Sequence, residues 1–189
     1  MKKTLLVDID DTTIMSMSTI YEIYKEETNT TGEMPQNYLY SFEGVLPKNY
    51  VNRALELFES KEFFDRVEVM PNCKETLYKY KDKFDIKFCS IHNHRTAYRK
   101  IDYINKHFPF IKDVIILKNN GTFDKSIVKG DIIIDDKLSC VKGNRECKIL
   151  FGDYFYNYPI NLNYKEIELL STCVQAKDWL EVDKILERL

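Results

Sequence analysis

The fold is decided by the stretch Leu5-Leu6-Val7-Asp8-Ile9-Asp10-Asp11-Thr12-Thr13, which lies almost at the N-terminus. Its first three residues are apolar, and such a run favours a strand that is buried on both faces of a parallel sheet. Three acids follow within four residues, and their mutual repulsion adds nothing to a hydrophobic core. Acids placed directly after a buried strand lie where open α/β sheets bind their ligands. The stretch therefore predicts a buried first strand that ends in a ligand site.

The spacing of the first two acids suggests a chemical role. In strand-like geometry Asp8 and Asp10 point to the same side, because side chains alternate with a period of two. Two carboxylates that converge can share a hard cation such as Mg²⁺, or one can attack a substrate while the other transfers a proton. An acidic turn after an edge strand is the alternative, since D-x-D-x-T is a short pattern. The rest of the chain decides between them.

Composition limits the class of protein. The chain has 189 residues, of which 44% are hydrophobic and 31% charged, so we expect one globular domain or one domain with a sizeable insertion. A net charge of −2 argues against a broad basic face for duplex nucleic acid. No apolar run is long enough to span a membrane, and the apolar stretch behind Lys2 and Lys3 ends at Asp8, too early for a signal peptide. We therefore expect a cytoplasmic protein with neither nucleic-acid duplex nor membrane as a partner.

Cysteines and histidines offer little metal chemistry. The five cysteines are odd in number and no C-x-x-C occurs, so neither a disulfide framework nor a zinc site is indicated. Three histidines are too few for a His-based metal site. We expect His92 and His94 to be solvated loop residues.

Apolar runs and helical periodicity alternate along the chain. The predicted strands cover residues 5–7, 85–90, 114–117, 130–136 and 148–152. The predicted helices cover residues 14–27, 51–61, 72–83, 95–108 and 179–189, and a turn is predicted at 119–121. From residue 72 onward strands and helices alternate, which indicates a parallel sheet with helices on both faces. The fold class is thus α/β, a three-layer Rossmann-like parallel sheet.

The segment between the first two strands is too long for a simple crossover. We interpret residues 14–70 as a small inserted helical cap, and residues 1–13 and 71–189 as the α/β core. Tyr38, Tyr40 and Phe42 alternate within the cap and are expected to form its core. A platform on which a base stacks is the alternative for these three rings.

Four polar groups lie at strand ends or in the loops beside them. They are Asp8 with Asp10, Ser90, Lys125, and Asp135 with Asp136. Each supplies something that phosphoryl transfer needs. A carboxylate can attack phosphorus, a second can donate a proton, and a hydroxyl can bind a phosphate oxygen. A lysine stabilises the transferring group, and a further acid completes a Mg²⁺ site.

The order and placement of these groups resemble the four motifs of the haloacid dehalogenase (HAD) superfamily of phosphatases. A closer similarity is to the 5'(3')-deoxyribonucleotidase family. It rests on Met70-Pro71, Asp124-Lys125-Ser126, Gly130-Asp131, Ile134-Asp135-Asp136, and Leu150-Phe151-Gly152 with Asn157.

The resemblance implies a role for each acid. Asp8 would be the nucleophile and Asp10 the general acid and base. Asp8 would bind Mg²⁺ by its side chain and Asp10 by its backbone carbonyl. Asp136 would complete the protein ligands, and Asp135 would lie in the second shell of the metal, near Lys125.

The same resemblance implies the activity. Ser90 and Lys125 would hold the phosphate. The protein would be a Mg²⁺-dependent phosphatase that acts on nucleoside, and by resemblance deoxyribonucleoside, 5'- or 3'-monophosphates through an aspartyl-phosphate intermediate. Its oligomeric state is left open, a homodimer being one option.

Two departures from the family pattern keep alternatives open. Asp11 and Thr12 stand where the family commonly has glycine and a small apolar residue, and Asp11 is a candidate helix cap. Ser90 is followed by Ile-His-Asn, where a threonine followed by Ser-Pro is common, so His92 or Asn93 would have to replace a second hydroxyl. The alternatives are a HAD phosphatase for another small phosphoester or a polynucleotide end, and a non-catalytic domain that binds a nucleotide or a partner.

Overall fold

The computed structural model describes residues 1–39, 41–118 and 124–189. Tyr40 and the predicted turn at 119–121 lie outside the described residues.

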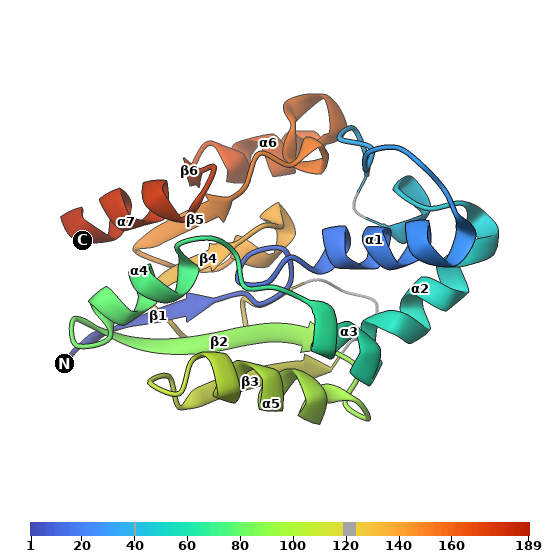
Figure 1. Cartoon of the computed structure of the whole chain (residues 1–189). Helices are drawn as coiled ribbons and strands as arrows, with labels where there is room; N and C mark the ends of the chain where they lie inside the picture. Colours follow the sequence, from blue (N-terminus) through green and yellow to red (C-terminus); the bar gives the residue numbers. More distant parts are fainter. Residues whose placement is uncertain (40, 119–123) are drawn as a thin grey trace.

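A parallel sheet forms the centre of the molecule (Figure 1). Within the described residues its strands are β1 (Lys3–Val7), β2 (Phe84–His92), β3 (Asp113–Lys118), β4 (Ile132–Asp135), β5 (Cys147–Phe151) and β6 (Val174–Ala176). They lie in the order β3-β2-β1-β4-β5-β6, and each neighbouring pair is parallel. The five predicted strands and the α/β class are confirmed. The sixth strand was not predicted, because it has three residues and two of them are exposed.

The central strands are apolar because both faces of the sheet are covered. Leu5, Leu6 and Val7 are fully buried, as parallel sheets require of their inner strands. Leu5 and Val7 belong to the larger hydrophobic core, whereas Leu6 belongs to a smaller core on the opposite face. The alternation of side chains along β1 thus places one strand in two cores.

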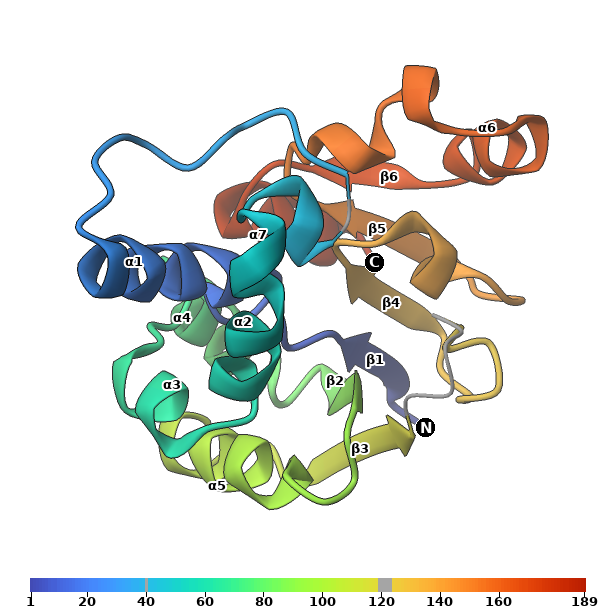
Figure 2. The same ribbon diagram turned by 90° about the vertical axis from the view of Figure 1, so that its right-hand side faces the viewer.

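Helices complete a three-layer arrangement (Figures 1 and 2). The larger core is shared with α4 (Cys73–Tyr80), α5 (Ala97–His107) and α7 (Trp179–Arg188). The smaller core is shared with α6 (Tyr164–Leu170) and the 3₁₀ turn η3 (Leu138–Val141). Two further 3₁₀ turns, η4 (Phe155–Asn157) and η5 (Pro159–Asn161), precede α6. Helix α6 was not predicted, although Asn163 and Glu166 form a capping box at its start.

The inserted helical segment follows β1 and lies beyond the carboxyl ends of the strands (Figure 1). It contains α1 (Ser16–Thr28), η1 (Phe42–Gly44), η2 (Lys48–Tyr50), α2 (Val51–Phe58) and α3 (Lys61–Arg66). The single helix predicted over 51–61 is wrong at its end, because Ser60 caps a new helix by accepting a hydrogen bond from Phe63 N (3.1 Å). The boundaries of this cap at residues 14 and 70 stay a prediction.

The chain enters and leaves the inserted segment at one place. Met15 N donates to Glu68 O (2.9 Å) and Met70 N donates to Thr13 O (2.8 Å), and Ile14 pairs with Val69 as an antiparallel bridge. We call this pair of short stretches, residues 13–15 and 68–70, the neck.

The strand order locates the ligand site. β1 and β4 are neighbours at the centre, and the chain runs outward from them in opposite directions, to β3 on one side and to β6 on the other. In open α/β sheets ligands bind at the carboxyl ends of the strands where the order reverses. Asp8 directly follows β1, Asp135 ends β4 and Asp136 follows it, so these acids lie at that point.

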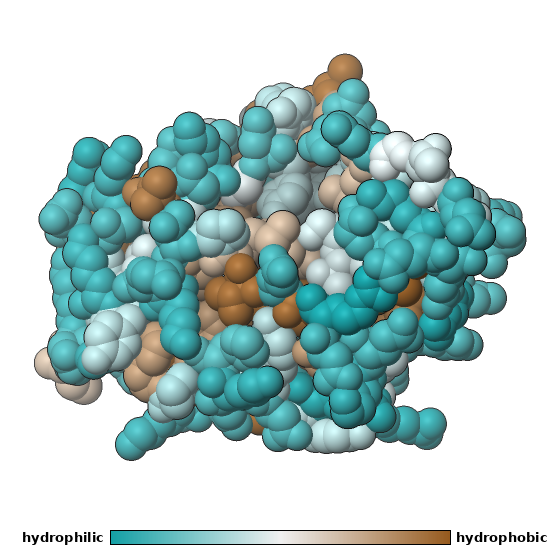
Figure 3. Space-filling model, in the orientation of Figure 1, coloured by the Kyte–Doolittle hydropathy of each residue, from teal (hydrophilic) through white to brown (hydrophobic). Residues whose placement is uncertain are grey.

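The face shown in Figure 3 is covered mainly by hydrophilic residues. Among the described residues, we find no helix with the length and apolar character needed to cross a bilayer.

Candidate active site

Asp8 is held at the end of β1 by its backbone. Its N–H donates to Ile134 O of β4 (2.9 Å), and its carbonyl accepts a hydrogen bond from Thr13 Oγ1 (2.6 Å). The side chain is buried and contacts Lys125 Nζ. Burial raises the pKa of Asp8 to about 7, although the charge of Lys125 opposes this shift. The carboxylate is therefore costly to keep ionised without further positive charge.

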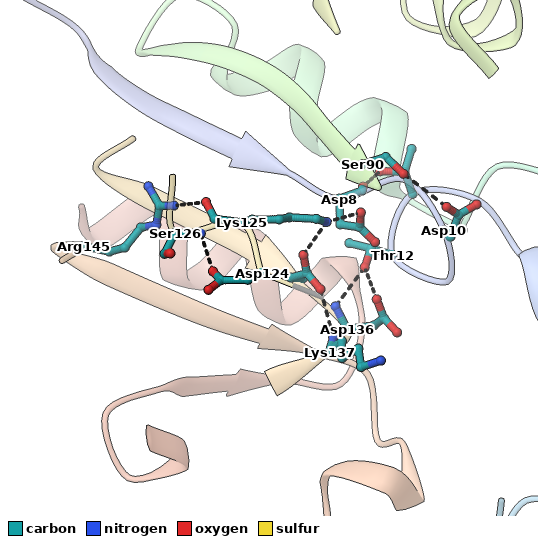
Figure 4. Close-up of polar contacts among 12 residues, drawn as sticks. Asp8, Asp10, Thr12, Ser90, Asp124, Lys125, Ser126, Asp136, Lys137 and Arg145 are labelled. Carbon is teal, nitrogen blue, oxygen red and sulfur yellow. Dashed lines mark hydrogen bonds and ion pairs between the residues drawn. The ribbon is translucent and has the colours of Figure 1, made fainter. Parts of the chain in front are cut away.

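Lys125 reaches the site from the loop before β4. Its buried Nζ lies between Asp8 and Asp135, 2.6 Å from Asp135 Oδ2 (Figure 4). Arg145 fixes the segment by donating to Lys125 O (3.0 Å) and to Gly130 O (2.9 Å). Burial disfavours the ammonium, but Asp135 and Asp8 outweigh it and keep the pKa of Lys125 well above its usual value. Lys125 is thus a fixed positive charge.

Three carboxylates gather beside this lysine. One oxygen from each of Asp8, Asp135 and Asp136 lies within 4.8 Å of the others, and all three residues are buried. Burial raises the pKa of Asp136 well above its ordinary value, and the charges of Asp135 and Asp8 raise it further. Such an all-oxygen set of crowded acids has the chemistry of a site for a hard divalent cation, so these residues fit Mg²⁺.

Asp10 turns away from the other acids. It accepts hydrogen bonds from Ser16 Oγ (3.0 Å) and Ser90 Oγ (3.2 Å), and it pairs with Lys100 Nζ. Asp10 does not continue the side-chain alternation expected of a strand, because the chain turns there. Thr13 N donates to Ile9 O (2.9 Å) across the turn, and Asp11 has φ 49°. Asp8 and Asp10 therefore pair with different lysines.

Lys100 is a site residue that the sequence analysis missed. It lies on α5 and is fully buried, with Nζ 3.2 Å from Ser90 Oγ and in contact with Asp10. Burial alone would raise the pKa of Asp10, but Lys100 and its hydrogen bonds hold that pKa below its usual value. The sequence offered one signal for a buried Lys100: it shares the buried face of α5, at helical spacing, with Ala97, Tyr103 and Ile104.

The residues that depart from the family pattern hold the turn after β1. Asp11 Oδ1 accepts a hydrogen bond from Met17 N (2.8 Å) in the first turn of α1, although the N-cap position of that helix is Met15 and not Asp11. Thr12 Oγ1 accepts from Asp136 N (3.0 Å), and Thr12 O accepts from Trp179 Nε1 of α7 (2.8 Å). The turn is thereby tied to α1, to the end of β4 and to the C-terminal helix.

His92 differs from its prediction as a solvated loop residue. It ends β2 and is only 3% exposed, whereas His94 is exposed. Its ring packs on Phe58, with the centroids 5.6 Å apart, and Nε2 lies 3.3 Å from Thr96 Oγ1. Burial lowers the pKa of His92 to about 4, so the imidazole is neutral at neutral pH.

Two cavities meet at Asp10. The smaller, of about 30 Å³, is bordered by every site residue predicted from the sequence: Asp8, Asp10, Ser90, Lys125, Asp135 and Asp136. The larger, of about 450 Å³, lies between the core and the inserted segment. Its walls include Phe42, Val51 and Phe58 from the segment and His92 from β2. A small cavity with mainly charged walls therefore lies next to a larger, partly apolar one.

This geometry agrees with comparisons to known proteins. Residues 2–188 match the model of the family described as "5' nucleotidase, deoxy (Pyrimidine), cytosolic type C protein". The chain belongs to this nucleotidase family. A curated 5'(3')-deoxyribonucleotidase from Clostridium acetobutylicum is 27% identical over an alignment 199 residues long, which covers 100% of this chain and 97% of the relative.

Solved structures of HAD proteins share the fold of this nucleotidase. A conserved haloacid dehalogenase-like protein of unknown function from Agrobacterium tumefaciens has a TM-score of 0.63 at 10% identity, covering 100% of this chain and 99% of its own. The HAD-hydrolase YfnB from Bacillus subtilis, solved bound to magnesium, has a TM-score of 0.57 at 16% identity and covers 98% of both chains. The family match over residues 2–188 confirms the predicted nucleotidase family, so the protein is a phosphomonoester hydrolase, and the solved structures show that it has the HAD fold.

Proposed function

We propose that this nucleotidase releases phosphate from deoxyribonucleoside 5'- or 3'-monophosphates, with Mg²⁺ and through an aspartyl-phosphate on Asp8. The observation that carries the proposal is the small cavity, because all six residues expected to perform this chemistry border it. The curated relative, named as a 5'(3')-deoxyribonucleotidase, supports the class of substrate.

The metal would be held by the side chains of Asp8 and Asp136 and by the backbone carbonyl of Asp10. When bound, Mg²⁺ supplies the positive charge that lets a phosphate approach these carboxylates. Asp135 would stay outside the ligand set, since both of its oxygens already accept hydrogen bonds: Oδ2 from Lys125 Nζ (2.6 Å) and Oδ1 from Lys137 N (3.0 Å).

The chain's own groups would then divide the reaction. A carboxylate oxygen of Asp8 attacks phosphorus and forms the acyl phosphate, while the bond to the nucleoside oxygen breaks. A phosphate bound to Lys100 would draw that positive charge away from Asp10, so Asp10 takes up a proton from solvent as the substrate binds. Asp10 gives this proton to the leaving oxygen, and afterwards accepts a proton from the water that attacks the intermediate. Ser90 and Lys125 bind phosphate oxygens. Lys100 Nζ, 3.2 Å from Ser90 Oγ, is placed to bind the same phosphate.

The larger cavity would hold the nucleoside. Its volume of about 450 Å³ lies within the usual range of about 300–1,000 Å³ for small-molecule sites. Phe42 and Phe58 pack edge to face, with ring centroids 6.0 Å apart, and both line the cavity. Aromatic rings of this kind stabilise a base by stacking.

A panel of phosphomonoesters tests the function. Phosphate release from deoxyribonucleotides, ribonucleotides and sugar phosphates would be measured with Mg²⁺ and with EDTA. We expect deoxyribonucleoside monophosphates to be hydrolysed fastest and EDTA to abolish the reaction. If sugar phosphates turn over and no nucleotide does, the proposed substrate is wrong. Nucleotide binding without turnover would instead support a non-catalytic domain.

Phe42→Leu is expected to weaken nucleotide binding selectively. Stacking of a base on an aromatic ring contributes about 1–3 kcal/mol, so KM for a deoxyribonucleotide should rise by roughly 5- to 150-fold. The kcat for p-nitrophenyl phosphate, which has no base, should change little. Phe110→Leu, which lies outside the two cavities, is the matched control. Equal losses on both substrates would contradict a base site at Phe42.

A further inference from the structure

Two stacked tyrosines follow β5 and lie against the acidic site. The rings of Tyr154 and Tyr156 are nearly parallel, at 6°, with their centroids 5.2 Å apart. The chain reaches them through Gly152, which has φ 80°. A Cβ at Gly152 would lie only 2.1 Å from Tyr154 Cε2, so the glycine allows the ring to fold back onto the backbone.

Tyr156 contacts one of the three clustered carboxylates directly. Its hydroxyl donates to Asp136 Oδ2 (2.5 Å), and both side chains are buried. The backbone of Asp136 is also engaged, since its N–H donates to Thr12 Oγ1 (3.0 Å) and its carbonyl accepts from Asn157 Nδ2 (2.5 Å). Among the described residues, Asp136 Oδ1 accepts only a long hydrogen bond, from Thr12 Oγ1 at 3.4 Å. Oδ1 is thus the oxygen that is left for a cation.

The tyrosine stack also reaches the turn after β1 and the inserted segment. Tyr154 OH donates to Asp11 O (2.7 Å), beside the residue whose carbonyl is proposed to bind the metal. Tyr38 of the inserted segment packs on Tyr156, with ring centroids 5.9 Å apart. The phenol of Tyr156 is therefore held in place by packing on two sides.

We infer that Tyr156 is a positioning residue for the divalent cation, because its phenol holds Asp136 by Oδ2 and leaves Oδ1 to bind the metal. This inference rests on the metal site in the proposed function. Groups that orient a metal ligand by a hydrogen bond commonly account for about 10–100-fold in metal affinity. A donor on Oδ2 also lowers the negative charge that the carboxylate offers a cation, but the gain from orienting Oδ1 outweighs this loss.

Tyr156→Phe tests the inference because it removes the hydroxyl and keeps the ring. Mg²⁺ would be titrated into the purified full chain by calorimetry, with no substrate present. We expect the Kd for Mg²⁺ to rise by about 10–100-fold. Tyr158→Phe is the matched control: the same change in the same loop, where the hydroxyl donates to Asp153 Oδ1 (2.9 Å). The control should bind Mg²⁺ within two-fold of the parent.

A second variant and a second readout separate positioning from folding. Tyr154→Phe removes the other hydroxyl of the stack. We expect it to lower Tm but to weaken Mg²⁺ binding much less than Tyr156→Phe. Saturating Mg²⁺ should restore most of the kcat of Tyr156→Phe, which a purely structural defect would not allow. Unchanged or tighter Mg²⁺ binding by Tyr156→Phe, or equal weakening in Tyr154→Phe, would overturn the inference.

Failure of the proposed function gives a different result. A parent protein that binds Mg²⁺ but hydrolyses no nucleotide overturns the substrate and leaves the role of Tyr156 standing. A parent protein that binds no Mg²⁺ overturns the metal site and the role of Tyr156 together.

Discussion

Asp8→Asn is expected to abolish turnover, whereas Asp10→Asn is expected to leave a single burst of product. The first change removes the attacking oxygen and a metal charge, so no covalent intermediate can form. The second leaves Asp8 able to attack and keeps the backbone carbonyl of residue 10. It removes a proton donor and base that typically contribute about 10²–10⁴-fold.

Rapid mixing with p-nitrophenyl phosphate separates the two roles. Nitrophenolate needs little protonation to leave, so Asp10→Asn should release about one equivalent per enzyme and then turn over slowly. Asp102→Asn, an exposed acid on α5, should behave as the parent does. A burst from Asp8→Asn with none from Asp10→Asn would assign the nucleophile to the other aspartate.

Lys100→Met is expected to lower kcat/KM by about 10²–10³-fold, which is the usual cost of removing one group that stabilises developing charge. The same change leaves Asp10 without the lysine that pairs with it. Breaking a buried ion pair by removing one partner destabilises a protein by about 3–5 kcal/mol, and the slight exposure of Asp10 reduces that cost. The free energy of unfolding should therefore fall as well.

Urea unfolding and steady-state kinetics would be measured on the same preparations, well below the unfolding midpoint. Lys106→Met is the control, since it makes the same change at an exposed position of α5. A fall in stability with an unchanged kcat/KM would show that Lys100 serves the fold and not the phosphate.

Much of the fold could be predicted because its central strands are buried on both faces. Residues 5–7 and 132–134 form continuous apolar runs for this reason, and the distance from β1 to β2 indicated an insertion. Helix α6 and β6 carry no comparable signal. Each residue of α6 is at least partly exposed, and in β6 only Ala176 is buried.

The site was predictable where it follows strand ends. Parallel strands bring their carboxyl ends to one edge, so Asp8, Ser90 and Asp136 could be placed together. Lys100 and Tyr156 enter from a helix face and a late loop, and a contact through space leaves no pattern in the sequence. The side chain of Asp10 was misplaced because a strand period was applied to a turn that contains the left-handed Asp11.

The neck has a consequence for how such an enzyme can change. The inserted segment forms a closed loop, since its two ends, residues 13–15 and 68–70, are hydrogen-bonded to each other. The entropy of closing a loop grows only with the logarithm of its length, so doubling the segment would cost about 0.6 kcal/mol. Insertions and deletions in this segment can therefore change the shape of the larger cavity beside Asp10 without changing the register of β1 against β4. The inserted segment, which we propose to contact the nucleoside, can therefore change in length and sequence independently of the strand ends that carry the proposed catalytic acids.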